Sequence, residues 1–246
     1  MIKRILSFTV SAMAAIAVNH VCADTVTLVK AGTLKDAVSA PGSVSSLTVS
    51  GPMDASDFDF INRNMPNLVT IDLEGATIEE YSGSSVLTGY STSPANTLPA
   101  YGLHGMKLTS VALPASVATL GEGSLAGISA TTLSLPSVTT VGDGAFAGSV
   151  NLVSVALSDD AVTLGKLAFA GCSSMASVTL NADRLPDGAF KNCTSLSAVS
   201  MNSATERTVA EAFMGLPSFG SVLFGARLAG IVHGVVLASR TEKLAS

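Results

Sequence analysis

An internal repeat organises most of the 246-residue chain and constrains its fold more than any other feature. Each copy carries the apolar pattern L-x-x-L-x-L, as in Leu108–Leu113, which predicts a short strand with alternate residues pointing inward. A unit this short cannot bury its apolar residues alone, so neighbouring copies are expected to stack into a solenoid. The central aliphatic residues, which lie 22, 22, 23, 21 and 23 residues apart, are Val111, Leu133, Val155, Val178, Val199 and Val222.

A second block follows each strand and supplies two further inward rows of side chains. Leu120–Gly127 reads L-G-E-G-S-L-A-G, and Val141–Gly148 reads V-G-D-G-A-F-A-G. We interpret the Gly-x-Gly pairs as turns that permit tight stacking, because glycine tolerates backbone conformations that are closed to other residues. A phosphate-binding loop would need a strand-to-helix context and a Lys-Ser or Lys-Thr pair, which both blocks lack.

The strand and the block together resemble the BspA-like subfamily of leucine-rich repeat proteins. That subfamily is marked by a strand followed by V-x-x-I-G-x-x-A-F-x-x-C, and residues 98–236 follow this pattern. The period and the resemblance predict a repeat solenoid: a short right-handed coil with a parallel β-sheet of about eight strands and a mostly irregular or short helical convex side. The resemblance also implies an exported, non-enzymatic interaction module that adheres to host, matrix or neighbouring-cell proteins.

Four segments are expected along the chain. The N-terminal unit is predicted to contain a helix that begins at Asp54, with Phe58, Ile61 and Met65 on one face. Residues 74–97 break the period with Ser, Thr, Gly and Pro, and we interpret them as a surface loop inserted in this unit. The predicted segments are a signal peptide at 1–23, an N-terminal capping unit at 24–97, repeats at 98–218, and a degenerate last repeat with a C-terminal cap at 219–246.

The first 23 residues have the three parts of a secretory signal peptide. A basic start, an apolar run over residues 5–18 and the small residues Val21 and Ala23 predict cleavage before Asp24. A membrane anchor would need about 20 apolar residues. A lipoprotein signal would use Cys22, but the residues before it do not form the required small, apolar box. The protein is therefore expected to be exported and extracellular or at the cell surface, with the periplasm as an alternative, and without a transmembrane segment.

Low charge and few aromatic residues exclude several classes of protein. Only 13% of the residues are charged, whereas disordered tails and coiled coils need far more charge. The chain has 13 basic and 18 acidic residues, a net charge of −5, which excludes a basic nucleic-acid-binding protein. Loss of residues 1–23 would remove Lys3 and Arg4, leaving 11 basic against 18 acidic residues and a net charge of −7.

The sequence predicts no catalytic, metal-binding or cofactor-binding residues, and therefore no enzyme. His104 and His233 lie in distant repeats, whereas a catalytic triad or a zinc site needs converging side chains at defined spacing. Asp159 and Asp160 could suggest a metal ligand pair, but we interpret them as part of a solvated loop between a strand and a turn.

Cys172 and Cys193 occupy the same position of successive repeats, three residues after a phenylalanine. Stacked repeats lie roughly 4.8 Å apart, so distance permits a disulfide, but equivalent side chains in a ladder point in parallel. We favour free, packed thiols. The other occupants of this position suggest a small, buried apolar site and are Met106, Ile128, Ser149 and Leu216.

The outward strand positions define the candidate binding face, which carries no aromatic and no basic residue. Hot spots of protein interfaces are enriched in Trp, Tyr and Arg, so the stronger candidate anchors are the tyrosines of the insertion. The candidate residues are Asp72, Glu74, Ser154, Ser177, Thr179, Asn181, Ser200 and Asn202 on the strands, and Tyr81 and Tyr90 in the insertion.

Two interpretations of this face remain open. It is either a shallow hydrogen-bonding surface for a protein or a glycan, or the solvated sheet of a structural spacer or surface-layer component. Carbohydrate capture is the weaker function because aromatic stacking platforms are missing from the strands. The expected partner is a protein, with a glycan as an alternative and no nucleic acid, and the expected state is a monomer.

Overall fold

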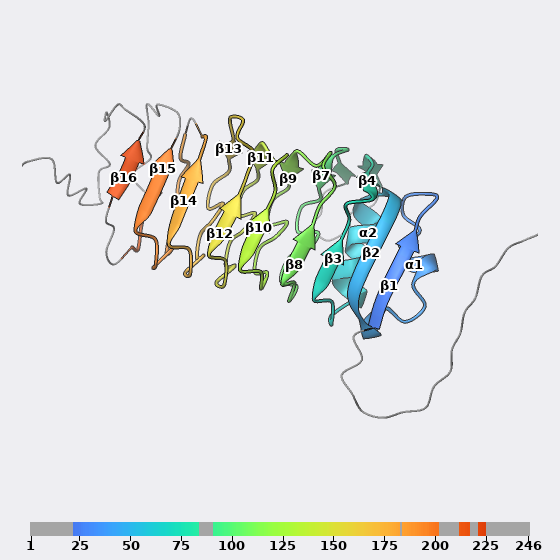
Figure 1. Cartoon of the computed structure of the whole chain (residues 1–246). Coiled ribbons are helices and arrows are strands. Elements are labelled where there is room, and N and C mark those ends of the chain that lie inside the picture. Colours follow the sequence, from blue (N-terminus) through green and yellow to red (C-terminus); the bar gives the residue numbers. More distant parts are fainter. Residues whose placement is uncertain (1–21, 84–90, 183, 202–211, 217–220, 225–246) are drawn as a thin grey trace, which may run out of the picture.

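The computed structural model describes residues 22–83, 91–182, 184–201, 212–216 and 221–224. The chain winds into a parallel β-solenoid with one row of strands along its length (Figure 1). We call the surface of this row the strand face. Its strands are β1 (Cys22–Thr27), β2 (Val44–Met53), β3 (Thr70–Asp72), β8 (Ser110–Ala112), β10 (Thr132–Ser134), β12 (Ser154–Ala156), β14 (Ser177–Leu180), β15 (Ala198–Met201) and β16 (Ser221–Phe224).

Equivalent residues of successive repeats pair across the strand face. Leu133 pairs with Val155, and Val178 pairs with Val199, so the predicted repeat alignment is also the strand register. The predicted parallel solenoid is confirmed. However, the hydrogen-bonded ladder is not continuous: it consists of β1-β2-β3-β8, of β10-β12 and of β14-β15-β16.

A second row of short strands lies behind the first (Figure 1). Thr-Leu or Thr-Val pairs of successive coils stack in register, which lets their backbone groups form a four-stranded parallel sheet. The prediction of a mostly irregular or short helical convex side missed this sheet. Its strands are β7 (Thr97–Leu98), β9 (Thr119–Leu120), β11 (Thr140–Val141) and β13 (Thr163–Leu164).

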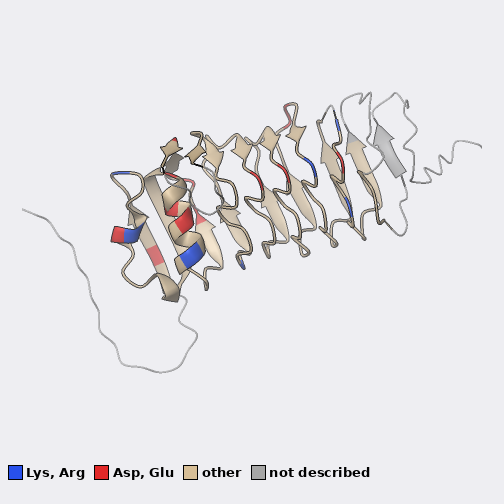
Figure 2. Cartoon of the chain, turned by 180° about the vertical axis from the view of Figure 1, so that it is seen from behind, with Lys and Arg blue, Asp and Glu red and all other residues tan. Residues whose placement is uncertain are grey.

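The described helices all lie in the N-terminal unit: α1 (Leu34–Ala37), the 3-10 turn η1 (Pro41–Ser43) and α2 (Ala55–Asn64). As predicted, Asp54 caps α2, where its carboxylate accepts a hydrogen bond from the Ser56 N–H at 2.8 Å. Phe58 and Ile61 are buried beneath the helix, as predicted. In the view from behind, charged positions gather on α1 and α2 and are scattered along the repeats (Figure 2).

Asp57, in the first turn of α2, ties the helix to the preceding loop. Its carboxylate accepts hydrogen bonds from the backbone N–H groups of Gly32 at 2.8 Å, Leu34 at 2.9 Å and Asp54 at 3.0 Å. Burial raises the pKa of Asp57, and the nearby Asp54 carboxylate adds to this effect, while the three N–H donors oppose it.

The segment 74–97 differs from the surface loop predicted for it. Its start forms β4 (Ala76–Ile78), which pairs with the end of β2 and buries Ala76 and Ile78. The segment continues with an antiparallel pair, β5 (Tyr81–Ser82) and β6 (Thr92–Ser93), and it ends in β7. The prediction failed because short strand segments are hidden among turn-forming residues.

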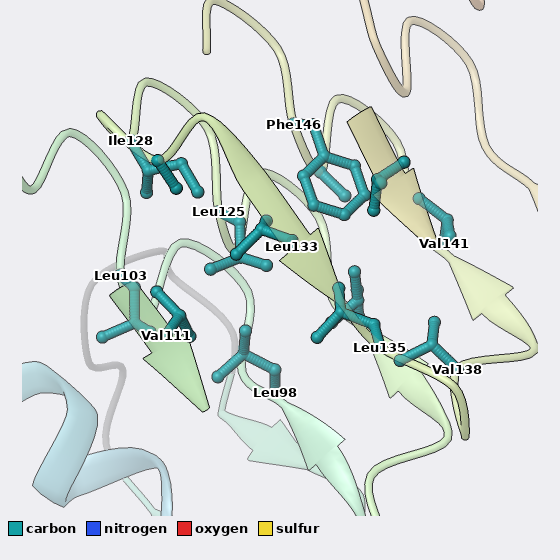
Figure 3. Close-up of a cluster of buried hydrophobic side chains, with 14 of the residues drawn as sticks. Leu98, Leu103, Val111, Leu125, Ile128, Leu133, Leu135, Val138, Val141 and Phe146 are labelled. Atoms are coloured by element: carbon teal, nitrogen blue, oxygen red, sulfur yellow. The ribbon is translucent and has the colours of Figure 1, made fainter. Parts of the chain in front are cut away.

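The core is a stack of aliphatic and aromatic rows running through the coils, and Figure 3 shows the part with aliphatic side chains around β8 and β10 together with Phe146. From Phe146 onward the aromatic rings of successive coils form a column. Phe146 and Phe169 stack at 5.0 Å between ring centroids, Phe169 and Phe190 at 5.4 Å, and Phe190 and Phe213 at 5.7 Å. Leu125 occupies the same position one coil before Phe146, as the repeat alignment predicts.

Cys172 and Cys193 are free and fully buried, as favoured from the sequence. Their position is not simply apolar, which corrects the interpretation given above. The Cys172 Sγ–H donates to the Phe146 carbonyl at 3.2 Å, and the Cys193 Sγ–H donates to the Phe169 carbonyl at 3.0 Å. The Ser149 hydroxyl makes the same bond to the carbonyl of the preceding coil, at 3.1 Å. Burial raises the pKa of both thiols, that of Cys193 to about 11.

The glycine pairs act as the predicted stacking turns. A Cβ on Gly142 would lie 2.7 Å from the carbonyl oxygen of Leu120, so only glycine permits this approach between coils. The position two residues later is left-handed, with φ of +59° at Gly144. Tyr101 and Leu167 occupy the same position of their coils with φ of +55° and +56°, which costs a non-glycine residue conformational energy.

Candidate binding face

Most of the described candidate residues that were predicted on strands are exposed to solvent. Asp72, Glu74, Ser154, Ser177 and Thr179 are exposed. The other described candidates, Asn181, Ser200 and Tyr81, are half-buried, and Asn202 and Tyr90 lie outside the described residues.

Strand register aligns these side chains in rows. Thr70 pairs with Ser110, Thr132 with Ser154, and Thr179 with Ser200, so within a ladder hydroxyls recur at about the strand spacing of 4.8 Å. Tyr81 stands on β5, which pairs with β6 and joins none of the ladders of the strand face.

Two interruptions divide the strand face, one between β8 and β10 and one between β12 and β14. The coils remain joined just before the strands, where the Ser129 N–H donates to the Leu108 carbonyl at 3.0 Å and the Ser174 N–H donates to the Val150 carbonyl at 3.2 Å. Beyond these bonds, no ladder joins the two neighbouring strands at either interruption.

Each interruption coincides with an open groove. The larger groove, of about 630 Å³, lies between β8 and β10 and is lined by residues 109–115 and 132–138 together with Glu74 and Val117. The smaller groove, of about 320 Å³, lies between β12 and β14 and is lined by residues 154–159 and 177–181. Of the predicted candidates, the larger groove includes only Glu74, whereas the smaller groove includes Ser154, Ser177, Thr179 and Asn181.

In both grooves, short and mostly polar side chains lie at the surface, and apolar side chains lie beneath them. Val111, Leu133 and Leu135 form the floor of the larger groove and belong to the buried cluster in Figure 3. Glu74 is the charged residue of its lining, and Asp159 is that of the smaller groove. Neither lining includes a basic or an aromatic residue.

The described residues offer little for catalysis. They contain no group of three or more His, Cys, Asp or Glu side chains that could hold a metal ion. His104 packs its ring edge against Tyr101 at 5.6 Å, and the Tyr101 hydroxyl donates to the Glu122 carboxylate, but none of these residues lines a groove. Asp159 and Asp160 are exposed and stand after β12 in a loop, and His233 lies outside the described residues.

A comparison with known protein families identifies the family of this chain. The family model of the BspA type leucine rich repeat region matches residues 96–221 in six copies. The chain belongs to this family. The resemblance seen in the strand and the Ala-Phe block is therefore confirmed, and both grooves lie within the BspA-type repeats apart from the contribution of Glu74.

Other comparisons add a solved structure. A leucine rich cell surface protein from Faecalibacterium prausnitzii A2-165 is similar to this BspA-type chain, with 16% sequence identity and a TM-score of 0.31, over 73% of this chain and 72% of that chain. No curated protein matches the chain.

Two observations concern the predicted signal peptide and the alternative of a membrane anchor. None of the helices in the described part of the chain is long and apolar enough to cross a membrane. The predicted leader lies outside the described residues except for Cys22 and Ala23, which are the first residues of β1.

Proposed function

We propose that this BspA-type protein is a non-enzymatic interaction module that is exported and binds protein partners through its strand face. Solenoid repeats generally create extended binding surfaces rather than enclosed reaction sites. The observation that carries the proposal is the pair of grooves at the interruptions of the strand face, which expose hydroxyls and backbone beside an apolar floor.

The grooves favour a protein over a glycan. Sugar rings are commonly held against aromatic side chains, and neither lining contains one. A protein segment can use short hydroxyl side chains, backbone groups and an apolar floor together. Export is supported by the signal-peptide pattern of residues 1–23, and a place at the cell surface follows from the resemblance to adhesive family members.

The experiment measures saturable binding of the purified protein to a panel of purified extracellular-matrix and bacterial surface proteins. Ser154→Trp and Ser177→Trp place bulky rings on the strand face, and Thr163→Trp places one on β13, in the second row. We expect at least one saturable partner, weakened by the two strand-face variants and not by the third. Thermal unfolding of each variant shows whether it is folded.

A structural spacer is the second candidate function, favoured by the absence of aromatic and basic residues from both groove linings. No saturable partner in the panel, or equal weakening by Thr163→Trp, would overturn binding through the strand face. The first of these results is the one that the spacer predicts.

A further inference from the structure

The groove between β8 and β10 exposes backbone as well as side chains. In the ladders on either side of the interruption, β3 pairs with β8 and β10 pairs with β12. Each of the two strands thus has one paired edge and one edge that faces the groove without a strand partner. Backbone N–H and C=O groups need hydrogen-bond partners, and at an open edge they can bond to water or to an extended ligand.

The side chains along the groove are small enough to leave this backbone accessible. Ser110 and Ala112 stand on β8, and Thr132 and Ser134 stand on β10. Ser110, Thr132 and Ser134 are exposed, while Ala112 is half-buried. A ligand with alternating side chains and regularly spaced amides could therefore use the hydroxyls and the strand edges together.

The larger groove carries negative charge and no positive charge in its lining. Glu74 lines it and is exposed, and its backbone N–H donates to the exposed Asp72 carboxylate at 3.0 Å. The lining contains no Lys or Arg to neutralise Glu74. The smaller groove has the same character, because Asp159 is exposed there and its lining also contains no Lys or Arg.

From the open strand edges, the short hydroxyl side chains and the uncompensated carboxylate, we propose that the groove between β8 and β10 binds an extended basic peptide segment. Peptide amides bond to the groove edges, and a Lys or Arg side chain pairs with Glu74, beside Asp72. This inference rests on the proposed function and specifies its partner. Anionic ligands such as phosphate or sulfated sugars are disfavoured because they would meet Glu74 without a compensating cation.

The test uses a fluorescent eight-residue peptide of alternating lysine and threonine, with both ends blocked, and measures anisotropy against the purified protein. Matched peptides replace lysine by glutamate or by serine. We expect saturable binding of the lysine peptide, weaker binding of the serine peptide and none of the glutamate peptide. Added salt should weaken lysine-peptide binding, because the pairing charges are exposed.

Two pairs of variants locate the site. Ser134→Trp fills the groove, while Thr163→Trp places the same ring on β13 in the second row, outside both groove linings. Glu74→Gln removes the lining charge, while Glu80→Gln removes an exposed carboxylate outside the groove. We expect at least tenfold weaker binding for Ser134→Trp, about three- to fivefold weaker binding for Glu74→Gln, and no change for the two controls.

Equal binding of all three peptides, or equal effects of a variant and its control, would overturn the inference. So would no binding of the lysine peptide. If surface proteins still bind through the strand face in that case, the proposed function stands and only its basic-peptide specificity is wrong.

Discussion

The phenylalanine column should contribute to stability beyond its burial, and leucine substitutions measure that contribution. Phe169 is fully buried and stacks on two rings, Phe146 and Phe190, whereas Phe146 stacks on Phe169 alone. Leucine is a fair substitute because Leu125 fills the same position one coil earlier. A stacked aromatic pair is worth about 0.5–1.5 kcal/mol beyond its burial. Phe169→Leu should therefore lose about 1–3 kcal/mol from stacking, and Phe146→Leu about half of that.

Urea unfolding, followed by circular dichroism, measures both variants against the parent protein. Both lose a similar apolar area, so the difference between their free energies of unfolding reports the second ring contact. The comparison requires equal slopes with denaturant, because repeat proteins can unfold in parts. Equal losses for the two variants would mean that the second ring contact adds no stability and that the column is ordinary hydrophobic packing.

Three further changes test the structure at single positions. Cys172→Ser should retain the bond to the Phe146 carbonyl, whereas Cys172→Ala removes it and leaves that carbonyl with its bond from the Ser149 N–H alone, so this variant should be about 0.5–1.5 kcal/mol less stable to urea. Leu167→Gly should raise the free energy of unfolding by about 1 kcal/mol, because glycine relieves the strained φ of +56° and the lost side chain is 44% exposed. A lower urea midpoint than that of the parent protein would contradict this. The raised pKa of Asp57 means that the folded state binds this proton more tightly than the unfolded state. Stability contributed by Asp57 should fall as pH rises from about 4 through the raised pKa, and Asp57→Asn should flatten that part of the profile of unfolding free energy against pH.

The sequence predicted the elements whose residues repeat with a clear period. The central residues Val155, Val178 and Val199 mark their strands because inward and outward positions alternate over several residues. Asp54 was recognisable as the start of α2 because capping depends on a local pattern. Local chemistry and periodicity were therefore sufficient for the solenoid.

The second row of strands was not recognisable because each contains two residues, too few to show alternation. Thr119–Leu120 and Thr140–Val141 become a sheet only when the coils stack and their backbones meet. The donor position of the cysteines could have been found, since Ser149 occupies it in one coil and a hydroxyl is seldom buried without a partner.

The grooves depend on the separation of neighbouring strands rather than on residue type. Near the first interruption, Ala130 stands where the adjacent coils have Leu108 and Leu152. At the second interruption, the corresponding residues are Leu152 and Met175, so no shared sequence signal marks both grooves. Glu74 was predicted as part of the face, but its place in the lining of a groove could be seen only in the structure.

Hydrogen exchange followed by mass spectrometry, with and without saturating lysine–threonine peptide, tests binding at the strand face most directly. Peptide bound in the larger groove should slow amide exchange in residues 109–115 and 132–138, which line that groove, and leave exchange at β11 and β13 in the second row unchanged. Unchanged exchange in the groove segments, or protection of the second row instead, would show that the peptide binds elsewhere.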